Sequence, residues 1–144
     1  MDERDGNTRI GRLLANAYRL WQDRTYAGLA DRGFPEIRPA HSPVFRLLED
    51  GGKRVSDMAA QANITKQSMA YLVEDLEKLG FVEVGPDPQD GRAKLVSYTA
   101  RGRRAEKALR TLSLELEAKL ADAIGVPQLE AMRAALLQAS RAHD

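Results

Sequence analysis

A run of polar side chains opens one predicted helix near the middle of the chain. Thr65, Lys66, Gln67 and Ser68 are consecutive, and Tyr71 follows one turn later. Hydroxyl, amide and ammonium groups can hydrogen-bond to DNA base edges and phosphates, with Gln suited to adenine and Lys to guanine. The pattern indicates a helix end that reads duplex DNA, and the alternative is an ordinary solvated helix face.

A second group of polar residues lies in the segment 85–94. Arg92 and Lys94 are its cations, and Asp90 precedes Arg92 by two residues. An Arg at a hairpin tip can enter the narrow, electronegative minor groove. Asp90 can hold that Arg or the loop backbone in place. The alternative is a charged turn without a ligand. Beyond this loop, three cations either touch flanking phosphates or form a solvated helix start: Arg101, Arg103 and Arg104.

Two short helices joined by a tight turn would carry the first group. We expect one helix over 55–62, capped by Ser56, and another over 65–79, capped by Thr65. Asn63 between them tolerates a left-handed backbone, and Ala59 is small enough for the helices to cross closely. These features predict a helix-turn-helix rather than an unrelated helical hairpin, and they agree with the apolar positions Val55, Met58, Ala62, Ile64, Met69 and Leu72.

The period changes from helix to strand after Gly80. Segments 81–84 and 95–98 alternate like strands, and the polar stretch between them predicts a long protruding loop instead of a two-residue turn. Further helices are expected over 7–30, from the Ser42 N-cap to about 50, from the Thr99 cap to about 124, and over 128–141.

Composition excludes several classes of protein. The 144 residues include no Cys and two His, and the net charge is +1. We therefore expect no metal, no cofactor and no enzyme activity, since no phosphate loop or nucleophile motif is present. The polar N-terminus and the lack of a long apolar run predict a cytoplasmic protein without a signal peptide or membrane span. Residues 53–110 hold eleven Lys and Arg against eight acids, which favours an anionic partner.

The segment VSDMAAQANITKQSMAYLVEDLEKLGFVEVGPDPQDGRAKLVSYTARG, residues 55–102, resembles the core of the multiple-antibiotic-resistance regulator (MarR) family. The shared features are the Thr-Lys-Gln-Ser helix start, Leu-Glu-x-x-Gly-Phe-Val, Asp90-x-Arg92 and a Thr-x-x-Gly helix start. The resemblance implies a homodimer on a pseudo-palindromic operator, with Thr65, Lys66, Gln67, Ser68 and Tyr71 on the recognition helix and Arg92 at the wing tip. Family members often carry Arg where this chain has Val84-Gly85, so we expect lower affinity or a narrower role for the wing.

The expected fold is mainly α with a small β-hairpin wing, in a single MarR-like domain over 1–144. Residues 36–99 would form the winged helix-turn-helix, and residues 7–34 and 100–144 would form the helical dimerisation part. The apolar stripes of these terminal helices can pair across a two-fold axis. The alternative is that they cover one another within one chain.

Four residues form a candidate effector pocket for a small aromatic or anionic ligand: Tyr18, Trp21, His41 and Phe45. The resemblance suggests this region, whereas core packing is the alternative for Tyr18 and Trp21 and a structural hydrogen bond for His41. We expect a double-stranded-DNA-binding transcriptional regulator, a repressor released by such a ligand. The alternative is a winged-helix protein-interaction module without DNA binding. The operator, the regulated genes and the sign of regulation stay open.

Overall fold

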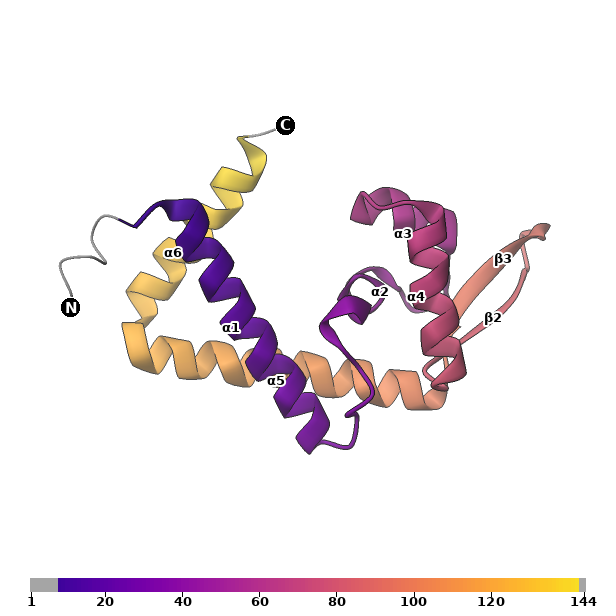
Figure 1. Cartoon of the computed structure of the whole chain (residues 1–144), viewed down its shortest axis with the longest axis horizontal. Coiled ribbons are helices and arrows are strands. Elements are labelled where there is room, and N and C mark those ends of the chain that lie inside the picture. The colour runs from indigo at the N-terminus through magenta and orange to yellow at the C-terminus, as the bar shows by residue number, and fades with distance from the viewer. Residues whose placement is uncertain (1–7, 143–144) are drawn as a thin grey trace. The chain divides into compact units, whose positions relative to one another are not determined.

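The computed structural model describes residues 8–142, so the predicted helix start at Asn7 lies outside it. Its contacts fall into two units, the first ending at Leu109 and the second beginning at Arg110. The elements appear along the chain in the following order (Figure 1): α1 (Ile10–Asp31), η2 (Pro39–His41), α2 (Ser42–Leu47), β1 (Lys53–Arg54), α3 (Val55–Ala62), α4 (Lys66–Lys78), β2 (Val82–Asp87), β3 (Asp90–Tyr98), α5 (Ala100–Ile124) and α6 (Val126–Arg141).

The first helix, α1, buries little of its apolar stripe. Thr25 and Leu29 near its C-terminal end are its buried residues. Towards its N-terminus the large apolar side chains are 44–69% exposed, and these are Ile10, Leu13, Leu14, Tyr18 and Leu20. An exposed apolar surface of this size along one helix usually marks a site of interaction with another protein chain.

The helix α2 starts differently from the prediction. Ser42 was expected to be its N-cap, but Ser42 lies inside the helix and His41 occupies the cap position without a side-chain cap bond. The reason lies in the preceding 3-10 turn. Pro39 opens that turn, and His41 already has helical backbone angles (φ −78°, ψ −11°) when α2 begins. The helix ends at Leu47 because Leu48 is extended.

The helix-turn-helix forms as expected, apart from the first cap. Asn63 is left-handed (φ 55°, ψ 43°), and Thr65 caps α4 by accepting the Ser68 backbone N–H at 3.0 Å. Ser56 does not cap α3, whose N-cap is Arg54. The strand β1 runs directly into α3, so Arg54 is the last extended residue (φ −79°, ψ 143°) and Ser56 is already helical.

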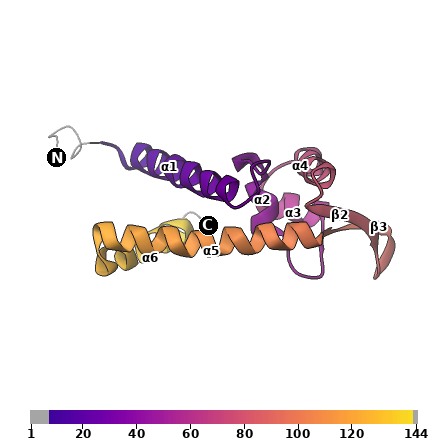
Figure 2. The same ribbon diagram turned by 90° about the horizontal axis from the view of Figure 1, so that it is seen from below.

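The hairpin is longer and its turn shorter than predicted. The strands β1, β3 and β2 form an antiparallel sheet in that order, with Val84 opposite Val96 and Pro86 opposite Lys94. The expected loop 85–94 is therefore mostly strand, and only Pro88 and Gln89 separate β2 from β3. A Pro is tolerated in β2 because this strand is at the sheet edge. Figures 1 and 2 show the hairpin projecting beyond the neighbouring helices.

An aromatic cluster joins these elements in the core of the first unit. The rings of Phe45 and Phe81 lie 6.5 Å apart edge to face, and those of Phe45 and Tyr98 stack at 5.9 Å. The sheet and the residue that precedes β2 add three buried side chains to this core, those of Phe81, Val82 and Val96. These contacts fix the hairpin to α2 and make a rigid base for the wing.

The second unit contains the rest of α5 and all of α6. Gly125 (φ 90°) separates the two helices, and Arg133 on α6 lies 3.1 Å from Glu117 on α5. Four large apolar side chains of α6 are 40–61% exposed: Val126, Met132, Leu136 and Leu137. Over the described residues, every helix is too short or too polar to span a membrane.

Candidate nucleic-acid interface

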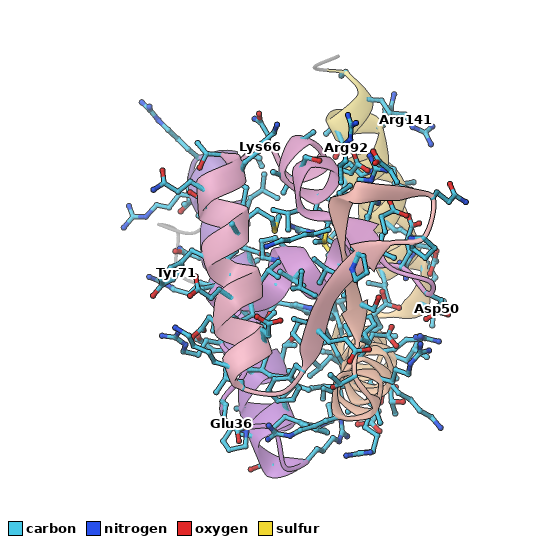
Figure 3. The ribbon with its side chains drawn as sticks, turned by 90° about the vertical axis from the view of Figure 1, so that its right-hand side faces the viewer. Glu36, Asp50, Lys66, Tyr71, Arg92 and Arg141 are labelled. Carbon is cyan, nitrogen blue, oxygen red and sulfur yellow. The ribbon has the colours of Figure 1, made fainter. Side chains whose placement is uncertain are left out.

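The outward face of α4 carries the residues that the sequence singled out. Met69, Val73 and Leu76 are buried and turn this helix towards the core. The five candidate contacts are all exposed: Thr65, Lys66, Gln67, Ser68 and Tyr71. Figure 3 shows Lys66 at the N-terminal end of α4 and Tyr71 on the side away from the hairpin. A ligand approaching this end therefore meets the polar side chains first.

The two hydroxyls at the start of α4 have different roles. Thr65 Oγ1 accepts the backbone N–H of Ser68 at 3.0 Å and donates its proton to Ser68 Oγ at 2.8 Å. Because Thr65 supplies the proton of that bond, Ser68 keeps its own hydroxyl proton for another acceptor. Thr65 shapes the helix end, and Ser68 is the better placed donor to a phosphate or base.

A hydrogen bond between the buried His41 and the Asp75 carboxylate holds the other half of α4. His41 is fully buried, and its Nδ1 accepts the Arg38 backbone N–H at 3.0 Å. The ring proton is therefore on Nε2, which donates to Asp75 Oδ2 at 2.5 Å. Arg38 Nη2 donates to the same oxygen at 3.3 Å. The His41 ring, followed by Arg38, holds the pKa of Asp75 below its ordinary value. Asp75 thus anchors α4 to η2.

Residue type and spacing alone do not predict this anchor, because His41 and Asp75 are 34 residues apart. The neighbours of Asp75 also have structural contacts. Glu74 pairs with Lys78 at 3.5 Å, and Glu77 Oε2 accepts the Val84 backbone N–H at 3.2 Å. That last bond covers an edge N–H of β2, and an unpaired edge of this kind invites pairing with other strands.

The wing, by which we mean the hairpin β2–β3, exposes its two cations on β3. Arg92 and Lys94 are both exposed. Asp90 Oδ1 accepts the Arg92 backbone N–H at 3.1 Å, so Asp90 holds the loop backbone, one of the two roles considered for it. The structure describes no bond between the Asp90 carboxylate and the Arg92 guanidinium. Arg92 therefore projects from a backbone that Asp90 supports.

Two adjoining cavities lie between α4 and the wing. The larger, about 640 Å³, reaches from Ala70 and Glu74 on α4 to Arg92 and Lys94 on β3. The smaller, about 490 Å³, brings Lys66 and Gln67 together with Lys94. One groove is thus bordered by the polar end of the helix and by the cations of the wing. The end of the groove near the start of α4 is basic, with Lys66 and Lys94 at its border. Glu74 and Glu77 border the part of the groove that lies further along α4.

Arg101 is not available as a phosphate contact of the kind considered from the sequence. Its guanidinium lies 4.3 Å from the centre of the Phe81 ring. Nη1 donates to the Leu79 carbonyl, and Nη2 donates to Glu36 Oε1 at 2.8 Å. Arg103 lies 3.8 Å from Asp50, while Arg104 is exposed. Arg101 thus joins α5 to the end of α4, a role that required knowledge of the fold.

The four candidate pocket residues lie in different surroundings. His41 has the structural bonds described above, and Phe45 is packed in the aromatic cluster. Tyr18 is 54% exposed and its hydroxyl accepts Gln22 Nε2 at 3.0 Å, while Trp21 is half-buried. The two cavities beside the wing are lined by other residues. An effector pocket at these four residues remains a prediction. Within residues 8–142 no group of acidic and His side chains could hold a metal ion, and His143 lies outside that range.

The helix-turn-helix, the three-stranded sheet and the projecting hairpin define a winged-helix protein with a DNA-binding fold. Residues 37–93 match the sequence model of the MarR family, and solved structures of MarR-family transcription regulators share the fold of the chain. Members of the MarR family are transcription regulators and not enzymes. An uncharacterized protein of Mycobacterium tuberculosis is 26% identical over 133 residues, 88% of this chain and 89% of that protein. The transcriptional activatory protein BadR of Rhodopseudomonas palustris is 34% identical over 58 residues, 40% of this chain and 33% of BadR.

Solved structures share the fold over nearly the whole chain. Staphylococcus aureus MepR in a complex with DNA superposes with a TM-score of 0.77 at 19% identity, covering 96% of this chain and 100% of MepR. CouR of Rhodococcus jostii RHA1, bound to p-coumaroyl-CoA, gives a TM-score of 0.70 at 25% identity, covering 88% of each chain. Relatives of this fold are thus known with DNA and with a small ligand.

Proposed function

We propose that the protein is a MarR-family regulator and that it binds double-stranded DNA sequence-specifically, as a homodimer on a pseudo-palindromic operator. The observation that carries the proposal is the groove between α4 and the wing. Within one unit it brings the exposed Lys66 and Gln67 beside Lys94, with Arg92 further along. Such a helix end can enter the major groove while the wing contacts the adjacent minor groove.

The roles within the interface follow from the side chains. Gln67 can hydrogen-bond an adenine edge in the major groove, and Lys66 a guanine edge or a phosphate. Ser68 can donate to a phosphate. Arg92 would enter the minor groove with Lys94 on the neighbouring backbone, and Tyr71 would meet the DNA on the side of α4 away from the wing. Lys66, Arg92 and Lys94 are the exposed cations that the helix end and the wing offer in each subunit, whereas Arg101 is already bonded to Leu79 and Glu36.

The homodimer is supported by the exposed apolar side chains of α1 and α6. Each helix exposes several large apolar residues in its own unit, and pairing of two chains would bury them. Repression is the proposed outcome, because a dimer seated on a promoter excludes other proteins by occupancy alone. BadR is named as an activator, so a reporter gene under the operator should be measured with and without the protein, and repression requires higher expression without it.

The proposal includes a small aromatic or anionic effector and a cytoplasmic location beside the genome. CouR is bound to p-coumaroyl-CoA, which supports a ligand of this general type. Since His41 is bonded to Asp75 and Phe45 is packed against Tyr98, Tyr18 and Trp21 are the better candidates for ligand contact. Aromatic acids and their thioesters, titrated against the protein–DNA complex, should release the DNA if the effector is of this class.

Binding to a duplex selected from a randomised library by the wild-type protein tests the DNA proposal. Arg92→Ala should weaken binding by about 1–3 kcal/mol, whereas Gln67→Ala should change the preferred base at one half-site position. Lys119→Ala, which removes an exposed cation of the second unit, is the control. Wild-type affinity and base preference in both groove variants would favour the protein-interaction module, to which the carboxylates of Glu74 and Glu77 beside the groove lend some support.

A further inference from the structure

One arginine outside the wing binds both carboxylates that flank the wing turn. Arg54 belongs to β1, where it pairs with Leu95 of β3. Its Nε and Nη2 lie 2.9 and 2.8 Å from Asp87 Oδ2, and Nη2 lies 3.9 Å from Asp90 Oδ2. Asp87 ends β2 and Asp90 begins β3. One guanidinium therefore joins the two strands of the wing at their turn.

Each of these carboxylates also binds a backbone N–H with its other oxygen. Asp87 Oδ1 accepts the Gln89 N–H at 2.9 Å, and Asp90 Oδ1 accepts the Arg92 N–H at 3.1 Å. The contacts form a continuous path from Arg54 through Asp90 to the backbone of Arg92. The position of the exposed Arg92 thus depends on a residue 38 positions earlier in the chain.

The charges of the wing turn also indicate that the wing depends on Arg54. The Asp87 side chain is 10% exposed and that of Arg54 is 37% exposed. The Gln89 N–H, followed by Arg54, lowers the pKa of Asp87 from its ordinary value, so the carboxylate is ionised at neutral pH. Without Arg54, two carboxylates beside Arg92 and Lys94 would repel an approaching phosphate, and Asp87 would lose the cation that compensates its burial.

We propose that Arg54 is a positioning residue for DNA binding, which holds the wing turn through Asp87 and Asp90 so that Arg92 is aimed at the minor groove. This inference rests on the proposed function. The competing interpretation is that Arg54 contacts a phosphate itself, since it also lines the smaller cavity with Lys66 and Lys94. The two interpretations make opposite predictions for Asp87.

A double-mutant cycle with Arg54→Gln and Arg92→Ala tests the proposal. The affinities of all four proteins are measured on the duplex selected by the wild type, after thermal melting has shown that each is folded. Arg54→Gln should weaken binding about fivefold or more in the wild-type background and less than about twofold when Arg92 is already Ala, because coupled residues act non-additively. Equal losses in the two backgrounds would overturn the proposal.

Asp87→Asn separates positioning from direct contact. It removes a negative charge and one of the two acceptor oxygens, so the side chain can no longer accept from both Arg54 and the Gln89 N–H. Positioning therefore predicts weaker binding, and direct phosphate contact predicts unchanged or tighter binding. Arg54→Lys keeps the charge without the fork that reaches both carboxylates; it should also bind more weakly, and wild-type affinity would contradict the proposal. Lys53→Gln is the matched control on β1, since Lys53 pairs with Glu49 and Gln61 instead.

Different results would refute the positioning role of Arg54 and the proposed DNA-binding function. A wild-type protein that selects no duplex and binds none would refute the proposed function. A wild-type protein that binds its selected duplex tightly, while Arg54→Lys or Asp87→Asn binds equally well, would refute the positioning role of Arg54 alone.

Discussion

Gly102 stands where the first turn of α5 meets the start of β2. A Cβ atom at this position would lie 1.9 Å from the Phe81 carbonyl oxygen, far inside van der Waals contact. Its backbone N–H is donated to Thr99 Oγ1 at 3.0 Å, and Thr99 Oγ1 donates to the Gly80 carbonyl at 2.6 Å. The Thr-x-x-Gly pattern is therefore explained by contact between two backbones, with Thr99 as the cap.

Gly102→Ala should consequently lower the free energy of unfolding by about 1–3 kcal/mol or more, because the Phe81 carbonyl belongs to the backbone and cannot turn aside. Urea denaturation followed by circular dichroism measures the change. Gly11→Ala is the control, since a Cβ there meets nothing within 4 Å and Ala favours the helix. Equal stability of the two variants would show that the backbones at Gly102 are further apart than described.

At the scale of the elements, the Asp75–His41 contact fixes α4, and it should make stability depend on pH. The pKa of Asp75 is lowered in the folded protein, so the ionised Asp75 carboxylate stabilises the fold above the ordinary Asp pKa of about 3.9. That contribution is lost as the pH falls through the lowered pKa.

Asp75→Asn should therefore cost about 1 kcal/mol at pH 7, because a neutral bond replaces a charge-assisted one. The difference from the wild type should persist to about pH 4 and shrink below it. Urea titrations at several pH values provide the measurement, with Glu74→Gln, an exposed carboxylate paired with Lys78, as the control. A difference that is unchanged well below pH 3 would mean that the Asp75 charge does not contribute.

Local signals predicted the elements that local interactions determine. Asn63 in the left-handed turn and the caps Thr65 and Thr99 depend on atoms within three residues. The expected Ser56 cap and the long wing loop were wrong, because both depend on strand pairing. Two residues of β1 are too few to give a pattern, yet their pairing with β3 decides where α3 begins.

In the candidate site, too, some residues could be predicted from local sequence signals and others could not. The exposed residues of α4 and the wing could be identified from residue type and helical period, since the buried stripe fixes which face is outward. Their supports could not, because each joins distant segments. Arg54 and Asp87 are 33 residues apart, and His41 and Asp75 are 34 apart. Arg101 looks like a DNA contact in the sequence, whereas in the structure its guanidinium is bonded to the Leu79 carbonyl and to Glu36.

For the whole molecule, the exposed apolar residues of α1 and α6 predict self-association. Sedimentation equilibrium at micromolar concentration should give about twice the chain mass of 15.9 kDa. Leu14→Glu, which places a charge on the 48% exposed Leu14 of α1, should shift the protein towards monomer. A folded wild type that stays monomeric would remove the physical basis for a palindromic operator.

The most direct measurement of the central claim is the affinity for operators with altered spacing and salt. A two-fold dimer places two α4 helices in successive major grooves, with half-site centres about 10 bp apart. Inserting five base pairs rotates one half-site to the opposite side of the duplex and should abolish tight binding. With Lys66, Arg92 and Lys94 from each subunit neutralising about six phosphates, affinity should fall roughly 10³-fold between 50 and 200 mM salt. Binding that tolerates the insertion, or that hardly changes over this salt range, would contradict the account.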